Sequence, residues 1–205
     1  MNTQEQIIEA IETGNTIKLF EIIKMGVDLK NCQINGNSLI YFATHYNQRR
    51  CAEILLEAGV NPDTPNKNGI TPLMHAAYLN YMDMVQMLVA RNVNLNASDS
   101  NFGYTALIES VRAGNEEVAE ILVKGGADPN FRDNNGWTAL HHAVYKGIVN
   151  IVELLIGAGA NVDTKSNNGE TAYTLATHFF NDDNLVEQSN VEECLRLLKI
   201  AGASS

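Results

Sequence analysis

The stretch that decides the fold reads Gly136-Trp137-Thr138-Ala139-Leu140-His141-His142-Ala143. A glycine-led segment of the same kind recurs along the chain, and successive glycines are 33, 34, 33 and 33 residues apart. The glycines that begin these segments are Gly36, Gly69, Gly103, Gly136 and Gly169. The one additional residue falls within residues 98–102. Repetition at a constant period of this length indicates a protein built from identical modules.

A second marker repeats with the same period and closes each module. It is a glycine or asparagine followed by a short Asp/Asn-rich segment: Gly59-Val60-Asn61-Pro62-Asp63, Asn92-Val93-Asn94-Leu95-Asn96, Gly126-Ala127-Asp128-Pro129-Asn130 and Gly159-Ala160-Asn161-Val162-Asp163. Such segments are rich in turn-forming residues. The two markers together define where each module begins and ends.

On these residues the chain resembles the ankyrin repeat, whose pattern is G-x-T-P-L-H-x-A-A, a turn, a second helix and G-A-D-x-N. Residues 71–77 and 138–143 match that pattern best, and the resemblance covers nearly the whole chain. It implies an all-α fold, an ankyrin-repeat solenoid of about six stacked helix pairs joined by β-hairpin-like loops.

The residues of one module, 133–165, agree with this reading. Thr138 is suited to begin a short helix and Gly147 to end it. A second helix is indicated by apolar residues at helical spacing: Ile148, Ile151, Val152, Leu155 and Ile156. Burying so few apolar side chains does not offset the conformational entropy lost when a whole module is ordered. Neighbouring modules must therefore supply the remaining burial.

We predict a single domain spanning residues 1–205. It consists of a capping repeat at 1–32, full repeats at 33–65, 66–99, 100–132 and 133–165, and a second capping repeat at 166–205. The last repeat carries an insertion at 180–189 compared with the others. We interpret the insertion as a tolerated loop or as a second contact with a partner.

Composition and charge narrow the classes of partner. The net charge of −10 and the pI near 4.9 disfavour binding to nucleic acid or to an anionic membrane. The first fifteen residues are too polar for a signal peptide, and no apolar run is long enough to span a membrane. An odd number of cysteines without metal-site spacing favours a reducing compartment. We therefore expect a cytoplasmic protein, monomeric by itself.

We interpret the histidines and the helical cysteines as structural residues rather than as catalytic or metal-binding ones. The sequence contains no phosphate-binding loop, HExxH, GxSxG or CxxC motif, so we predict no catalysis and no cofactor. His141 stands where the family's histidine bonds locally to the preceding threonine, and Cys51 and Cys194 lie on buried helix faces. His45 and His75 are the nearest histidine pair, but without a carboxylate partner they predict no metal site.

The family binds partners with hairpin tips and first helices, which line a concave groove. The residues of this chain in those registers are rich in aromatic side chains, which dominate binding hot spots together with Arg. The candidate partner-binding residues are His45, Tyr46, Ile70, Tyr78, Leu79, Phe102, Tyr104, Arg112, Trp137, Tyr145 and Lys146. The alternative is that these rings lie flat over neighbouring repeats and stabilise the stack.

We therefore predict a scaffold or adaptor that holds another protein on its concave aromatic face. The alternative function is an inhibitor or immunity-type regulator that blocks a partner enzyme. An enzyme in its own right would need an acid, base or nucleophile set that these short helices do not offer.

Overall fold

The computed structural model describes residues 3–30, 32–180 and 188–203. Most of the predicted insertion, residues 181–187, lies outside the described part of the chain. The described residues form twelve helices and one two-stranded sheet. They divide into two compact units, unit 1 (Met1–Asn94 and Asp99–Asn101) and unit 2 (Leu95–Ser98 and Phe102–Ser205). The division of residues 1–205 into six repeats of a single domain stays a prediction.

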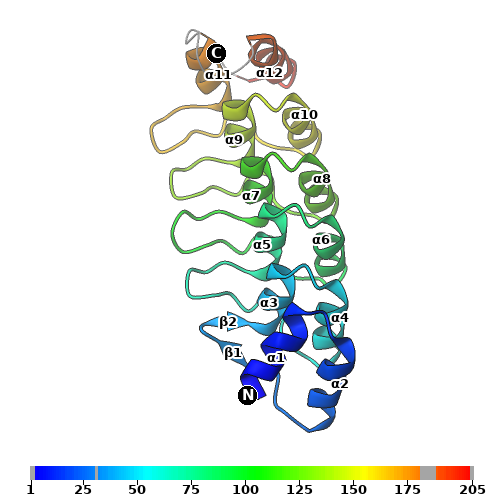
Figure 1. Ribbon diagram of the computed structural model, residues 1–205. Coiled ribbons are helices and arrows are strands. Elements are labelled where there is room, and N and C mark those ends of the chain that lie inside the picture. Colours follow the sequence, from blue (N-terminus) through cyan, green and yellow to red (C-terminus); the bar gives the residue numbers. More distant parts are fainter. Residues whose placement is uncertain (1–2, 31, 181–187, 204–205) are drawn as a thin grey trace. The chain divides into compact units, whose positions relative to one another are not determined.

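Unit 1 stacks three helix pairs (Figure 1). The pairs are α1 (Thr3–Glu12) with α2 (Thr16–Lys24), α3 (Leu39–His45) with α4 (Arg49–Glu57), and α5 (Pro72–Tyr78) with α6 (Met82–Val89). The first helices pack in the order α1, α3, α5, and α2 packs on α4. A hairpin of β1 (Gln33–Ile34) and β2 (Asn37–Ser38) precedes α3, and its turn has positive φ at Asn35 and Gly36.

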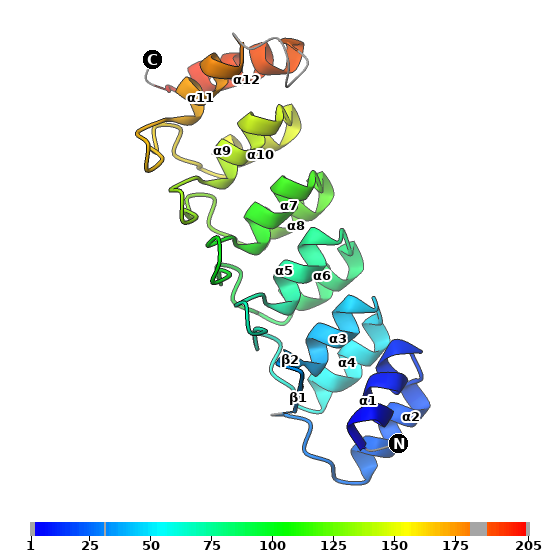
Figure 2. The same ribbon diagram turned by 60° about the vertical axis from the view of Figure 1, so that its left-hand side comes forward.

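Unit 2 repeats the arrangement with three further pairs (Figure 2). They are α7 (Ala106–Ala113) with α8 (Glu116–Lys124), α9 (Ala139–Lys146) with α10 (Val149–Gly157), and α11 (Ala172–Phe180) with α12 (Gln188–Ile200). Here α9 packs between α7 and α11, while α10 packs between α8 and α12. The predicted all-α architecture of stacked helix pairs is confirmed.

Local sequence sets where the first helices begin and end. The hydroxyls of Ser38, Thr71 and Thr105 accept the backbone N–H three residues later, at 3.1, 3.3 and 3.3 Å. Gly147 ends α9 in the left-handed conformation, as predicted from the sequence. Asn80 takes the equivalent conformation after α5, with φ of 59°, which asparagine tolerates better than most residues.

The core of each unit lies between its two rows of helices. Ile151, Val152 and Leu155 of the predicted second-helix face are buried, whereas Ile148 and Ile156 are only partly covered. Cys51 and Cys194 are fully buried, which confirms their structural interpretation. Burial raises the pKa of both thiols, that of Cys194 to about 11. No helix among the described residues combines the length and the apolar character that a bilayer crossing requires.

Hairpin tips of successive repeats are joined by backbone hydrogen bonds. In unit 2, Asn134 N donates to Phe102 O and Asn167 N to Asn135 O, both at 2.9 Å. In unit 1, Ser100 N donates to Asn68 O at the same distance. These bonds bring one tip close against the next. A Cβ on Gly136, where φ is +75°, would lie 2.8 Å from the backbone nitrogen of Asn167.

A pair of glycine substitutions separates tip packing from conformational strain. Gly114 also has positive φ, +79°, but a Cβ there meets no atom within 4 Å. We expect Gly114→Ala to cost about 1–2 kcal/mol of stability through the left-handed conformation alone. Gly136→Ala should cost about 1–3 kcal/mol more, because the neighbouring backbone must also move. Urea unfolding of both variants measures the difference, and equal losses would contradict close tip packing.

Candidate protein-binding surface

One connected set of side chains in unit 2 contains most of the predicted aromatic residues. Phe102, Tyr104 and Trp137 come from the hairpin segments that precede α7 and α9, Arg112 from α7, and His142 and Tyr145 from α9. We call the set Phe102, Tyr104, Arg112, Trp137, His142 and Tyr145 the unit 2 aromatic surface. Lys146, the last residue of α9, directly follows Tyr145 and is exposed.

Tyr104 lies beneath its neighbours. The Phe102 ring is stacked on it, with centroids 5.1 Å apart and planes 15° apart. The guanidinium carbon of Arg112 lies 4.0 Å from the centroid of the Tyr104 ring, a cation–π contact. Tyr104 is therefore only 8% exposed, whereas Phe102 is 56% exposed. The expectation that Tyr104 itself faces a partner is corrected: this ring supports Phe102 and Arg112.

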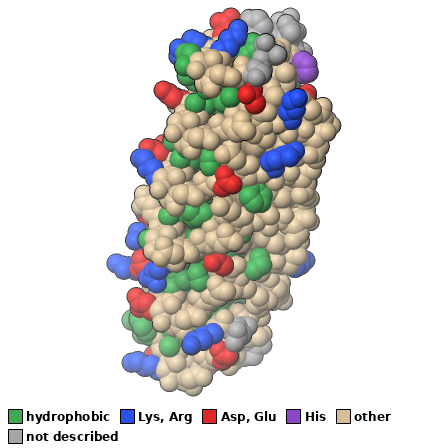
Figure 3. All heavy atoms as spheres, turned by 180° about the vertical axis from the view of Figure 1, so that it is seen from behind, with side chains coloured by type: hydrophobic (Ala, Val, Ile, Leu, Met, Phe, Trp, Pro, Cys, Tyr) green, Lys and Arg blue, Asp and Glu red, His purple; other side chains and the backbone are tan. Residues whose placement is uncertain are grey.

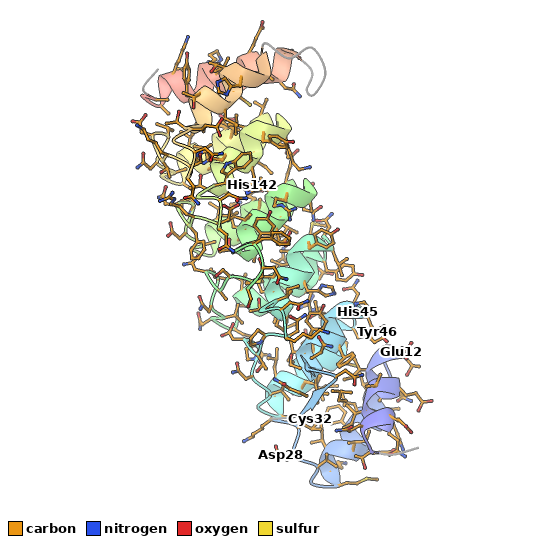
Figure 4. The ribbon with its side chains drawn as sticks, turned by 90° about the vertical axis from the view of Figure 1, so that its left-hand side faces the viewer. Glu12, Asp28, Cys32, His45, Tyr46 and His142 are labelled. Carbon is orange, nitrogen blue, oxygen red and sulfur yellow. The ribbon has the colours of Figure 1, made fainter. Side chains whose placement is uncertain are left out.

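His142 connects this cluster to the next hairpin. Its ring meets Tyr104 edge-on at 5.8 Å and Trp137 at 5.1 Å between centroids. Trp137 in turn lies 5.5 Å from Tyr145. The rings thus form one chain of contacts from Phe102 to Tyr145. His142, which links its two halves, is labelled in Figure 4. Trp137 is half-buried and Tyr145 is 44% exposed, so the chain ends at the surface.

A buried carboxylate holds the hairpin that carries Trp137. Asp133 Oδ1 accepts the backbone N–H groups of Asn135 and Trp137 at 2.8 and 2.9 Å. Its Oδ2 pairs with His142 Nε2 at 2.9 Å. Burial by itself would raise the pKa of Asp133, but these hydrogen bonds outweigh it and hold the pKa below its ordinary value.

Sequence reasoning did not single out Asp133 or His142 for this role, although the sequence carries a signal. A polar residue stands three positions before a repeat glycine in Asn66, Asp133 and Ser166. In each case its side-chain oxygen accepts the backbone N–H groups two and four residues later. The polar residue at this register therefore fixes the tip conformation.

His141 has the local role that the resemblance implied. Its Nδ1 accepts the backbone N–H of Thr138 at 3.2 Å and lies 2.9 Å from the Thr138 hydroxyl. Nε2 then carries the proton and donates it to the carbonyl of Glu170 in the following repeat, at 3.2 Å. Burial lowers the pKa of this imidazole, which keeps it neutral.

The remaining predicted residues lie in unit 1. His45 is exposed at the end of α3, and Tyr46, which follows it, meets its ring edge-on at 5.1 Å (Figure 4). Tyr78 is 56% exposed at the end of α5. Ile70 and Leu79 are partly exposed. Unit 1 therefore presents two exposed predicted rings, His45 and Tyr78.

Charge on the surface is mixed in sign. Arg112 Nη1 donates to Glu109 Oε2 at 3.0 Å, so the cation over Tyr104 is locally balanced. On the face shown in Figure 3, basic and acidic side chains are interspersed in both units with hydrophobic ones between them. Aromatic contact and hydrogen bonding, more than net charge, are what the unit 2 aromatic surface offers a partner.

Comparison with known proteins agrees with this architecture. A family model described as "Ankyrin repeats (3 copies)" matches residues 7–99, 43–133, 84–166 and 107–201, which together cover nearly the entire chain. The chain belongs to the ankyrin-repeat family. Ankyrin repeats generally mediate protein–protein interaction, and the family is typically non-catalytic.

Individual relatives share only parts of their length with this chain. It is 30% identical over 124 residues to ankyrin repeat domain-containing protein SAT10 of Stachybotrys chartarum, covering 60% of this chain and 6% of that protein. It is 42% identical over 70 residues to ankyrin repeat and SAM domain-containing protein 6 of Rattus norvegicus, covering 34% and 8%. It is 30% identical over 125 residues to putative ankyrin repeat protein FPV014 of Fowlpox virus, covering 60% and 28%.

Removing the charge of Asp133 tests how the tip is held. We expect Asp133→Asn to lose about 1–3 kcal/mol of stability at pH 7, since a buried hydrogen-bonded carboxylate is replaced. The folded-state pKa of Asp133 is depressed, so its contribution is fully present above the unfolded pKa of about 3.9. It disappears as the pH falls through the folded pKa. The gap between wild type and variant should therefore shrink below about pH 4.

Urea unfolding at pH 7 and pH 3 measures this gap. Asp128→Asn is the matched control, because Asp128 is exposed and its Oδ1 accepts one backbone N–H, from Asn130, that asparagine can also accept. The control should change stability by less than about 0.5 kcal/mol. A pH-independent loss in Asp133→Asn would show that its ionised form does not hold the tip.

Proposed function

We propose that this chain binds another protein through the unit 2 aromatic surface and acts as a scaffold or adaptor without catalysis of its own. The observation that carries the proposal is the continuous chain of rings that ends in two exposed side chains, Phe102 and Tyr145. Large aromatic side chains that gather at a protein surface mark interaction sites.

The arrangement suits binding because its exposed rings rest on fixed ones. Phe102 is stacked on the buried Tyr104, and Tyr145 lies against the half-buried Trp137. Trp137 is anchored through its own backbone N–H by Asp133. A partner that covers Phe102 and Tyr145 therefore meets rings already held in place, which lowers the entropy cost of association.

Residue chemistry also supports a protein partner. Tyr, Trp and Arg are the side chains most often found at binding hot spots, and all three types occur in this set. The Arg112 guanidinium has five N–H donors in a fixed fork, and its Nη1 group bonds Glu109. We infer a partner segment that places an apolar side chain over Phe102 or Tyr145 and an acceptor near Arg112.

The experiment measures partner binding after removal of the two exposed rings, Phe102 and Tyr145, and after removal of an exposed ring outside the unit 2 aromatic surface. Tagged wild-type chain and the double variant Phe102→Ala/Tyr145→Ala are used to recover proteins from the native source, followed by quantitative mass spectrometry. A purified partner is then titrated against each form. We expect the double variant to lose at least about 2 kcal/mol, or roughly 30-fold in affinity, because both exposed rings that the partner would cover are removed.

Phe20→Ala is the matched control, since Phe20 is 47% exposed on α2 of unit 1. It should recover the same partner with unchanged affinity. Circular dichroism establishes that all forms remain folded, as expected for substitutions of exposed side chains. Equal recovery of every partner by the double variant and by wild type would rule out this surface as the binding site.

A further inference from the structure

Unit 1 holds a pair of histidines that the proposed function does not use. His45 is the last residue of α3, and His75 lies in α5 of the following repeat. Their facing ring nitrogens, His45 Nδ1 and His75 Nε2, are 3.2 Å apart. The two rings are nearly parallel, with an interplanar angle of 18° and centroids 5.5 Å apart.

Both imidazoles are held by neighbouring aromatic rings. Tyr41 is stacked on His75 with centroids 4.6 Å apart, and Tyr46 meets His45 edge-on. His75 is largely covered, whereas His45 is exposed, so the pair is fixed on one side and reachable from solvent on the other. Figure 4 shows His45 and Tyr46 at the end of α3.

The 3.2 Å between the two nitrogens is the length of their N–H···N hydrogen bond, and it is also close to the separation of two nitrogens bound to one metal ion. Two imidazole nitrogens bound to one tetrahedral ion at about 2.0–2.1 Å lie roughly 3.3 Å from each other. We propose that His45 Nδ1 and His75 Nε2 form a two-imidazole site for a divalent transition metal of the Cu²⁺, Ni²⁺ or Zn²⁺ class, with water completing the coordination sphere.

Binding requires each ring to turn so that its lone pair points at the ion, and it requires the proton between the two nitrogens to leave. In the metal-free protein one of the two facing nitrogens carries the proton of their hydrogen bond, and the other accepts it. The metal takes the place of that proton, which moves through solvent to the other nitrogen of the same ring. Both imidazoles stay neutral, and each donates one lone pair to the ion.

Ligand chemistry sets the selectivity and strength of this site. Imidazole suits Cu, Ni and Zn, whereas Mg²⁺ and Ca²⁺ prefer oxygen ligands. Among the residues that the structure describes, no group of three His, Cys, Asp or Glu is placed to hold a metal. The site therefore has two protein ligands and binds metal more weakly than a structural zinc centre. Cu²⁺ should bind most tightly.

A metal bound here would join two repeats. His45 and His75 belong to first helices that pack against each other, so the ion would link α3 to α5. A ligand that binds only the folded state raises stability according to its concentration relative to its dissociation constant. The proposal therefore predicts both a binding stoichiometry and a thermal shift.

The test uses the full chain without a histidine tag, titrated with NiCl₂ by calorimetry and followed in thermal melts. We expect wild type to bind one Ni²⁺ per chain and to melt at a higher temperature in its presence. His45→Ala and His75→Ala should each lose at least tenfold in affinity and lose the thermal shift, because one of only two protein ligands is removed. MgCl₂ should have no effect on any form.

Two control variants separate this site from unspecific metal binding. His178→Ala removes an exposed histidine of unit 2, and Cys32→Ser removes the partly exposed thiol. Both should bind Ni²⁺ with the wild-type affinity. The electron paramagnetic resonance spectrum of bound Cu²⁺ should show two coupled nitrogens in wild type and fewer in His45→Ala.

Because His45 is exposed, His45→Ala keeps the fold and decides the question even if His75→Ala does not fold. Unchanged Ni²⁺ affinity in His45→Ala, or no saturable binding to wild type, would overturn the proposal. Neither result bears on protein binding by the unit 2 aromatic surface, which includes neither His45 nor His75.

Discussion

Apolar side chains buried between successive helix pairs hold each unit together. Each helix of units 1 and 2 is short, between 7 and 13 residues, and presents a single apolar face. Helices of this length are marginal in water by themselves. They are stable in the protein because each packs against its neighbours: α9 lies between α7 and α11, and α3 lies between α1 and α5. Backbone hydrogen bonds also join the hairpin tip of one repeat to that of the next.

This dependence on neighbours also positions the candidate site. The Asp133 carboxylate fixes the hairpin before α9 and pairs with His142 on α9 itself, so it links the loop to the helix. His142 then lies between Tyr104 of one repeat and Trp137 of the next. Side chains that stabilise the stack and side chains that face solvent are therefore parts of one cluster. Of the rings for which the sequence left binding and stacking open, Tyr104 is buried and stabilises the stack, whereas Phe102 and Tyr145 are exposed.

Features that depend on contacts within one repeat could be predicted from the sequence. The N-cap of α9 at Thr138 and its C-cap at Gly147 follow from residue types at fixed spacing, the local bonds of His141 are implied by the family resemblance, and all three are confirmed. The burial of Cys51 and Cys194 follows from helical periodicity in the same way. These predictions needed only the order of residues along a short segment.

Features that depend on side-chain direction between repeats could not be predicted. Whether Tyr104 is exposed depends on where Phe102 and Arg112 place their side chains and on how close His142 of the next repeat comes. The 3.2 Å distance between His45 and His75 likewise requires two first helices to pack with a particular register. A period of 33 residues indicates that repeats are neighbours, but it does not give the rotamers that decide which side chains touch.

We propose that a partner covers the exposed rings of unit 2, and footprinting measures whether it does. Hydroxyl-radical oxidation of the free chain and of its complex with a purified partner reports the solvent access of each aromatic side chain. We expect oxidation of Phe102 and Tyr145 to fall in the complex while that of Phe20 on α2 stays the same. Equal oxidation of Phe102 and Tyr145 in free and bound chains would contradict it.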